Sequence, residues 1–439
     1  MLPVDPPTIV LVTLDTTRAD ALSAERPTGP PYGPQVTPVL DTLAEQGARF
    51  SRAYTHAPST LSSHVAMFTG LDPHGHGIPR NGYPLDPALP TLAVRLHDAG
   101  YETVGVVGAA VLARDTGIAR GFDRFDDDLG GWPEARAEVV VRRALAAVDA
   151  REHPERPLFL WVHLYDPHGP YAPPPPFDRL FVGPGAVPTP DEVRDAVQAL
   201  AGDAATLEQV ARINGAYLGE VAYADTQLGA LLDQLGARGL LSRSLLVVAG
   251  DHGEALGDDP VYAWSHGSHV SDDVMRVPMV MLGRGLPLAR GIVVRSQVAN
   301  SGLGPTVLEL AGVGEPLGET ASFASLVRAG PVDDTDGWPS RPTRPVLLEA
   351  GRPRGSEATQ GWNDLPLARG VLAGGWAVTL VPFLGRGPAF GDGGLPPADG
   401  VRDVLVDLVH RWDLRAPERP EPLQDDAHTQ ALRALGYVE

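Results

Sequence analysis

The chain contains short runs of aliphatic and β-branched residues in which apolar positions follow one another without polar alternation. The runs span residues 8–14, 103–107, 158–164, 245–249 and 277–282. Such runs are typical of strands buried on both faces of a parallel sheet. They constrain the fold strongly, because a strand that is apolar on both faces needs a covering layer on each side.

Segments with helical periodicity lie between these runs, at residues 39–47, 89–99, 135–150 and 208–235. Strands that alternate with helices indicate βαβ units and a parallel sheet covered by helices on both faces. The sequence therefore predicts an α/β fold, a three-layer αβα sandwich around a large, mostly parallel sheet.

The C-terminal quarter has a different character. After about residue 333, short strand-like segments at 346–348 and 376–381 precede a polar tail with a helical stretch at 426–435. We expect a main domain at residues 1–332 and a smaller α+β subdomain at 333–439. The 50 glycines and 44 prolines concentrate in 26–34, 169–190 and 386–400, which predicts loops there.

Composition excludes several classes of protein. A formal charge of −20 argues against a nucleic-acid partner, and no apolar run is long enough for a membrane span, so we expect a soluble protein. The 35 basic residues are all arginine, and the absence of cysteine excludes disulfides, thiolate metal sites and cysteine nucleophiles. Residues 1–7 lack signal-peptide features, which predicts a cytoplasmic protein if the chain is complete and a periplasmic or secreted one if a signal was removed. The oligomeric state is left open.

Polar clusters follow three of the predicted strands, at residues 15–20, 166–168 and 251–254. An isolated Asp after a strand usually caps a helix, but three clusters on the carboxyl edge of one parallel sheet indicate a ligand site. Asp15, Asp251 and His252 offer oxygen and imidazole ligands of the kind that suit Zn²⁺, Mn²⁺ or Ca²⁺.

The segment 57–70, APSTLSSHVAMFTG, places small hydroxyl residues ahead of an apolar helical stretch that continues through Phe68. Ser59 or Thr60 could be the N-cap of this helix. The same position also places a hydroxyl at the positive end of the helix, where an anionic ester would bind and a metal ion would activate the hydroxyl.

Five blocks of sequence together resemble the sulfatase branch of the alkaline phosphatase superfamily. They are VTLDTTRADAL, AYTHAPSTLSSHVAMFTGLDPHGHG, FLWVHLYDPHGPYAPP, VVAGDHGEALGD and WSHGSHVSDDVMRVPMVM, which span residues 8–282 in the family's order. GPTVLELAGV extends the match to about residue 313. The resemblance implies that residues 1–332 form a sulfatase-like catalytic domain.

The resemblance implies that Asp15, Asp251 and His252 are metal ligands, and counting back ten positions from Gly70 places Thr60 at the nucleophile. Sulfatases carry a cysteine or serine there, which is oxidised to formylglycine, and an arginine four residues later, where this chain has His64. Threonine is instead the nucleophile of the superfamily's phosphodiesterases, phosphonate hydrolases and phosphoethanolamine transferases.

Thr16 replaces the second carboxylate of the family's Asp pair, so the implied ligand set is Asp15, Thr60, Asp251 and His252 around one divalent ion, Mn, Zn or Ca. The resemblance also places His168 and His266 where relatives bind the nonbridging oxygens or protonate the leaving group. With no lysine in the chain, these histidines and Arg18 would stabilise the transition state.

Four further residues allow two interpretations each. His64 could contact the substrate or pack in the core, and Asn81 could be an oxygen ligand or serve a turn. His74 and His76 could suggest a metal pair, but the matching family positions are structural.

The sequence thus predicts a metal-dependent hydrolase that cleaves phosphate or phosphonate esters of small anionic substrates through Thr60, of the phosphodiesterase or phosphonate monoester hydrolase type. Three alternatives stay open. They are a true sulfuric ester hydrolase, a phosphoryl or phosphoethanolamine transferase, and a non-catalytic member that binds anions.

Overall fold

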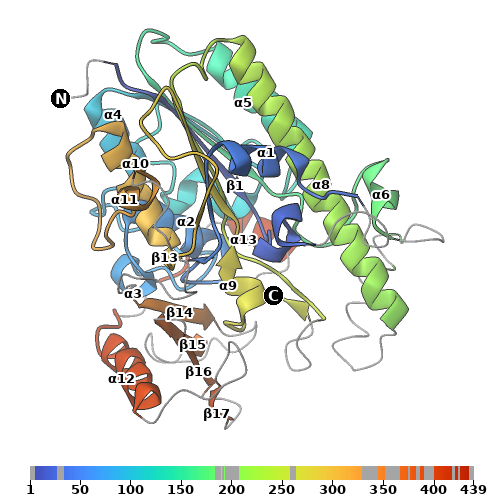
Figure 1. Cartoon of the computed structure of the whole chain (residues 1–439), viewed down its shortest axis with the longest axis vertical. Coiled ribbons are helices and arrows are strands. Elements are labelled where there is room, and N and C mark those ends of the chain that lie inside the picture. Colours follow the sequence, from blue (N-terminus) through green and yellow to red (C-terminus); the bar gives the residue numbers. More distant parts are fainter. Residues whose placement is uncertain are drawn as a thin grey trace.

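An eight-stranded sheet runs through the centre of the computed structural model (Figure 1). The structure describes residues 5–26, 34–182, 189, 192, 207–257, 264–328, 345–351, 366–373, 376–381, 386–389, 400–417, 421–423 and 426–434. Within them the strand order is β12-β2-β11-β7-β1-β6-β4-β5. The strands are β1 (Thr8–Leu14), β2 (Ala48–Phe50), β4 (Glu102–Val107), β5 (Arg124–Asp126), β6 (Leu158–Leu164), β7 (Ser244–Gly250), β11 (Met279–Arg284) and β12 (Ile292–Val294).

The sheet is mostly parallel, which confirms the predicted fold class. Strands β7, β1, β6, β4 and β5 are parallel to one another, whereas β11 is antiparallel to both of its neighbours, β7 and β2. The predicted run 277–282 is wrong as one strand, because it divides into β10 (Arg276–Val277) and β11 on either side of Pro278. Proline has no N–H to give to a strand ladder. Strand β10 instead joins a second sheet with β3 (Ala53–Tyr54) and β13 (Val298–Ala299).

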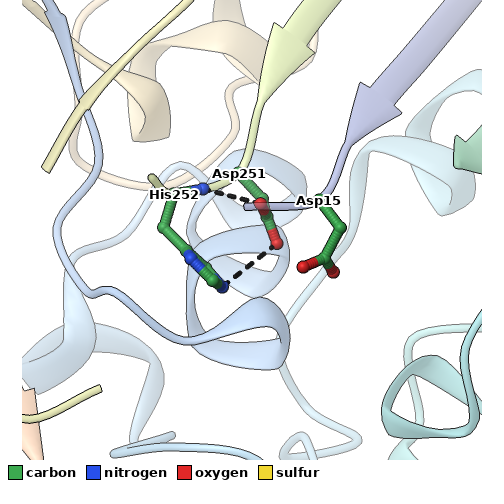
Figure 2. A group of neighbouring side chains, drawn as sticks. All are labelled: Asp15, Asp251 and His252. Carbon is green, nitrogen blue, oxygen red and sulfur yellow. Dashed lines mark hydrogen bonds and ion pairs between the residues drawn. The ribbon is translucent and has the colours of Figure 1, made fainter. Parts of the chain in front are cut away.

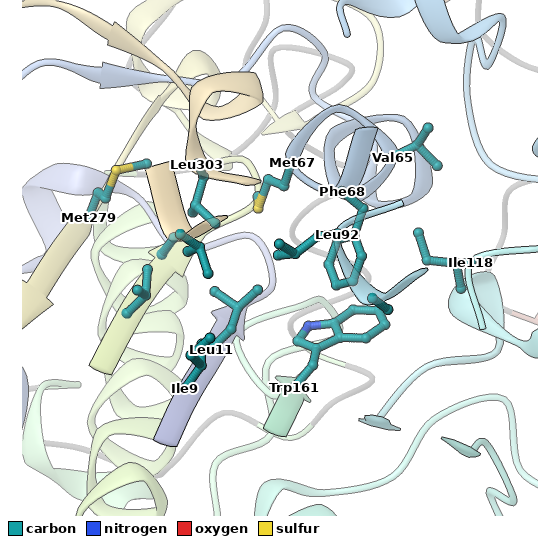
Figure 3. Close-up of a cluster of buried hydrophobic side chains, with 14 of the residues drawn as sticks. Ile9, Leu11, Val65, Met67, Phe68, Leu92, Ile118, Trp161, Met279 and Leu303 are labelled. Carbon is teal, nitrogen blue, oxygen red and sulfur yellow. The ribbon is translucent and has the colours of Figure 1, made fainter. Parts of the chain in front are cut away.

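Helices cover both faces of the central sheet. Alternate side chains of β1 enter two separate cores, as the pleat of a strand requires. Ile9 and Leu11 pack with Phe68 and Trp161 in one core (Figure 3), and Val10 lies in the other. The first core is covered by α2 (Thr60–Thr69), α4 (Leu92–Ala99) and α10 (Leu303–Ala311), and the second by α1 (Pro38–Gln46), α5 (Ala137–Asp149) and α8 (Leu207–Ala237).

Short elements connect these layers. They are η1 (Ala19–Ala21), η2 (Ser23–Glu25), α3 (Pro73–His76), η3 (Ala110–Leu112), η4 (Arg114–Thr116), α6 (Phe177–Leu180), β8 (Ala255–Leu256), β9 (Trp264–Ser265), α9 (Asp272–Met275), η5 (Asn300–Gly302) and α11 (Ala324–Arg328). None of the helices in the described ranges is long and apolar enough to cross a membrane.

The C-terminal part contains a four-stranded antiparallel sheet, β14-β15-β16-β17, which lies at the lower end of the molecule in Figure 1. Its strands are β14 (Val346–Gly351), β15 (Pro366–Ala373), β16 (Trp376–Val381) and β17 (Arg386–Ala389), with α12 (Val401–Asp413) packed on β15 and β16. Helix α13 (Asp426–Ala434) contacts η3, and its Leu432 enters the main core.

The predicted boundary at residues 332 and 333 lies outside the described residues, so the division into two domains stays a prediction. The predicted loop at 386–400 begins instead with strand β17, whose residues pair with β16. Parts of the loops predicted at 26–34 and 169–190 also lie outside the described residues.

Candidate metal and catalytic site

Two acidic residues meet where the central strands end (Figure 2). Asp15 directly follows β1 and Asp251 directly follows β7, and these strands are parallel neighbours with Leu14 opposite Gly250. Ligand atoms of Asp15, Asp251 and His252 all lie within 4.8 Å of one another, and all three residues are fully buried. This is the one group of three or more such side chains found within the described part of the chain.

The two oxygens of Asp251 have different surroundings. Oδ1 accepts backbone N–H groups from Thr16 at 3.1 Å and from His252 at 2.6 Å. Oδ2 has no hydrogen-bond partner among the described residues and lies 3.6 Å from Nε2 of His252 (Figure 2). Backbone N–H groups therefore fix Oδ1 of Asp251, while Oδ2 is available to bind an ion.

Asp15 is less satisfied still, because neither carboxylate oxygen has a hydrogen-bond partner among the described residues. A buried, unpaired carboxylate costs several kcal/mol. Burial raises the pKa of Asp15 to about 7, and burial together with the Asp15 charge raises the pKa of Asp251. A divalent cation fits this arrangement, since it would supply the missing charge and take up the unpaired oxygens.

His252 has the geometry of a metal-binding imidazole. Its Nδ1 lies 3.0 Å from the carbonyl oxygen of Gly253, to which it donates, so Nε2 carries a lone pair directed at the cluster. Burial lowers the pKa of His252, but the Asp251 and Asp15 carboxylates outweigh it and the net shift is upward. The three residues thus offer two carboxylate oxygens and one nitrogen.

Thr60 is the first residue of α2, and its Oγ1 lies 3.4 Å from Nε2 of His252. Ser59 occupies the N-cap position, yet its hydroxyl donates to Oδ1 of Asn81 at 3.1 Å. The same Asn81 oxygen accepts the N–H of Leu61 at 2.8 Å. Ser59 is thus the N-cap residue, but the cap hydrogen bond is accepted by Asn81 from another loop and not by a hydroxyl of Ser59 or Thr60. The Thr60 hydroxyl is left beside the cluster.

Thr16, which stands where the family has a second carboxylate, adopts a left-handed backbone with a φ of 42°. This conformation is rare for a β-branched residue and costs about 1–3 kcal/mol. Two hydrogen bonds hold it, from its N–H to Asp251 and from the Tyr217 hydroxyl to its carbonyl at 2.9 Å. The strain is thus located where the chain turns to place Asp15 and Asp251 together.

His266 and His168 lie close to the cluster. The His266 ring centroid is 4.5 Å from that of His252 and 5.2 Å from that of His168. Nδ1 of His266 lies 3.2 and 3.3 Å from the two oxygens of buried Glu254, and Nδ1 of His168 donates to the carbonyl of Gly169 at 2.8 Å. Burial lowers the pKa of His168 to about 3 and that of His266 well below its usual value, which favours the neutral form of both rings.

Arg18 lies at the edge of this group. Its guanidinium binds both carboxylate oxygens of Asp20, at 2.8 and 2.7 Å, and donates to the carbonyl of Glu254 at 3.2 Å. Because Asp20 holds the guanidinium of Arg18 through two hydrogen bonds, the positive charge of Arg18 is fixed beside Glu254.

A pocket of about 240 Å³ lies next to His168. Its lining carries three carboxyl groups, and the Asp15 charge contributes to the raised pKa of Glu134 after the effect of burial. The lining residues are Trp132, Glu134, Ala135, Arg136, Tyr165, Asp166, His168, Pro170, Ala172 and Glu220.

Three neighbours of the site were not predicted from the sequence, namely Glu254 as a partner of His266, and the fully buried Thr13 and His163. His64, for which two interpretations were open, is fully buried and contacts Thr13 and the carbonyl of Thr60. The sequence does contain a sign of Thr13 and His163, because each is a polar residue within a strand of mainly apolar residues.

Comparison with solved structures shows that the fold of this chain is shared with known proteins. One match is a structure in complex with its substrate D-glucosamine-2-N,6-O-disulfate, with a TM-score of 0.73, 16% identity and coverage of 94% of this chain and 98% of the other. Another is the phosphonate monoester hydrolase of Agrobacterium radiobacter, with a TM-score of 0.69, 20% identity and coverage of 93% and 94%. Both share the fold.

Sequence comparison identifies the family. The sulfatase family model matches residues 7–313. The arylsulfatase of Clostridium perfringens is 24% identical over 386 residues, which cover 71% of this chain and 76% of that protein. The chain belongs to the sulfatase family and is a hydrolase of that family, whose enzymes use a divalent metal ion.

Proposed function

We propose that this protein is a metal-dependent hydrolase that cleaves phosphate or phosphonate esters through Thr60. The observation that carries the proposal is the position of the Thr60 hydroxyl, at the start of α2 and 3.4 Å from Nε2 of His252, a proposed ligand. The chain has no cysteine that could become formylglycine. Asp15, Asp251, His252 and Thr60 would hold one divalent ion.

The bound ion would supply positive charge that favours the alkoxide form of Thr60 and stabilises charge on the phosphoryl oxygens. In the first step, Oγ1 of Thr60 bonds to phosphorus, the bond from phosphorus to the ester oxygen breaks, and the alcohol leaves with a proton. In the second step, water bonds to phosphorus and the Thr60 oxygen leaves as the hydroxyl. The substrate would approach the N-terminus of α2, whose free N–H groups favour an anion.

His266 is suited to move protons in both steps. With Glu254 as the partner of Nδ1, the Nε2 atom of His266 would be the one that takes a proton from Thr60 or water and returns it. His168 and Arg18 would stabilise the charge of the transition state. The alcohol part of the substrate would occupy the carboxylate-lined pocket beside His168.

A sulfate ester hydrolase is the second candidate, and the similarity to an arylsulfatase favours it. Formylglycine hydrate releases sulfate by elimination through its second hydroxyl group. Threonine has one hydroxyl and lacks this route, so an intermediate on Thr60 must be released by attack of water. This requirement favours phosphoryl groups, which serve as the covalent intermediate in relatives with threonine.

The test compares the purified protein on an aryl phosphodiester, an aryl phosphonate monoester and an aryl sulfate, each with Mn²⁺, Zn²⁺ or Ca²⁺. We expect the phosphorus esters to react fastest, and Thr60→Ala to lower kcat at least about 10³-fold. Thr60→Ser is the matched control and should retain measurable turnover. Fastest turnover of aryl sulfate would contradict the phosphoryl preference, and unchanged turnover by Thr60→Ala would contradict the nucleophile.

A further inference from the structure

A chain of buried polar groups lies directly beside the metal ligands. Oγ1 of Thr13 lies 2.9 Å from Nε2 of His64, 3.0 Å from Nδ1 of His163 and 3.1 Å from Nε1 of Trp161. Nδ1 of His64 lies 2.7 Å from the carbonyl oxygen of Thr60. All of these side chains are fully buried, so their hydrogen bonds must be satisfied within the protein.

The protons of this chain can be assigned from its contacts. A carbonyl oxygen only accepts, so Nδ1 of His64 carries a proton, and its Nε2 accepts the hydroxyl proton of Thr13. Trp161 donates its N–H to the Thr13 oxygen. Because the single proton of Thr13 is already used, Nδ1 of His163 must donate as well, and Nε2 of His163 is left with a lone pair.

The assignment applies to neutral rings, each with one proton on the Nδ1 that the hydrogen bonds require. Both rings are fully buried, and burial disfavours a charged imidazole.

The lone pair of His163 faces a second unsatisfied atom. Nε2 lies 3.3 Å from Oδ2 of Asp15, yet neither atom has a hydrogen-bond partner among the described residues. Two acceptors at this distance repel each other unless a proton or a metal cation lies between them, and a metal cation can also take up the second unpaired oxygen of Asp15. Two ligands of one ion, each bonded at about 2.0–2.2 Å and about 90–110° apart, lie about 3.0–3.5 Å from each other.

We propose that His163 supplies a further nitrogen ligand to the metal centre through Nε2, beside Oδ2 of Asp15. This inference rests on the metal centre of the proposed function and extends it. A metal-bound histidine usually gives its other N–H to a fixed acceptor, and Thr13 is that acceptor here. Two imidazoles, from His252 and His163, favour Zn²⁺ or Mn²⁺ over Ca²⁺, which prefers oxygen ligands.

The test counts the imidazoles bound to the ion. In protein loaded with Co²⁺, each ligated histidine with a proton on Nδ1 gives one exchangeable, strongly shifted proton signal in the NMR spectrum. We expect two such signals in the wild type, and one in each of His163→Gln and His252→Gln. His163→Gln should also weaken metal binding at least about 10-fold, measured by competition with a chelator.

His64→Gln is the matched control, because it alters the same buried chain without removing a proposed ligand, and it should keep both signals. A single signal in the wild type that disappears in His252→Gln would overturn the proposal, even if His163→Gln fails to fold. Two signals without any ester turnover would support the ligand while contradicting the proposed reaction.

Discussion

Two buried clusters of acidic and histidine side chains differ in how completely their polar atoms are satisfied. At the carboxyl edge of the central sheet, both oxygens of Asp15 and one of Asp251 lack a hydrogen-bond partner among the described residues. Between α3 and the C-terminal sheet, Glu349 binds His74 at 2.9 Å and Arg369 at 3.3 Å.

The second cluster connects α3 to the C-terminal sheet and to α12. The His74 ring stacks on the Trp412 ring of α12, with ring centroids 3.7 Å apart. Nδ1 of His74 lies 3.1 Å from the carbonyl oxygen of Trp412. His74 therefore ties α3 to β14 and α12. Burial of charge occurs in both clusters, so burial alone does not mark a functional site. The unpaired oxygens of Asp15 and Asp251 are what indicate a cation-binding site.

The largest expected effect is the loss of metal binding. Asp251→Asn removes the charge of the unpaired oxygen but keeps the shape of the side chain. We expect at least about 100-fold weaker metal binding and a comparable loss of kcat, because even the partners of metal ligands contribute 10- to 100-fold. Calorimetric titration with Zn²⁺ or Mn²⁺ measures the binding. In the metal-free protein the variant should be as stable as the wild type, and a large loss of stability there would mean that Asp251 has a structural role.

Glu349→Gln should have the opposite profile. Breaking a buried ion pair leaves His74 and Arg369 with weaker partners and typically costs about 3–5 kcal/mol of unfolding free energy. Denaturant unfolding measures this loss, while kcat per folded molecule and the metal affinity should be unchanged. If metal affinity fell as much as stability did, the division between a structural and a functional cluster would be wrong.

The third prediction concerns pH in the metal-free protein. The pKa of Asp15 is about 7 when folded and 3.8 in the unfolded reference. As the pH rises from about 4 to about 7, the unfolded chain loses this proton first, so folding stability falls, by at most about 4 kcal/mol.

Urea unfolding across this pH range, with and without saturating Zn²⁺, measures the effect. Asp15→Asn should flatten the dependence only in part, because burial also raises the pKa of Asp166 and Asp225 to about 7. A dependence equally steep in the variant would show that Asp15 does not contribute.

Much of the fold followed from local patterns. The runs at 8–14 and 158–164 became strands with those bounds, because a run apolar on both faces has few alternatives to the middle of a sheet. The run through Pro278 was misread, since the apolar pattern continues across the proline while the hydrogen-bond ladder cannot.

The strand-end pattern predicted the meeting of Asp15 and Asp251, and the structure brings them together. The roles proposed for Thr60, His168, His266 and Arg18 stay predictions. The sequence did not reveal that Asn81 caps α2 or that Glu254 orients His266, because these contacts depend on how loops pack in three dimensions. Glu254 is three residues from Asp251, but nothing in the sequence specifies its distant partner.

The two carboxylates of the proposed metal site are far apart along the chain, so the site forms late in the synthesis of the segment that joins them. Asp15 leaves the ribosome before Asp251, which follows 236 residues later. Since β7 must pair with β1 before the two carboxylates meet, no shorter nascent chain can hold the ion. Binding of the ion would therefore select for correctly folded molecules, because only a chain in which β7 has paired with β1 would retain it.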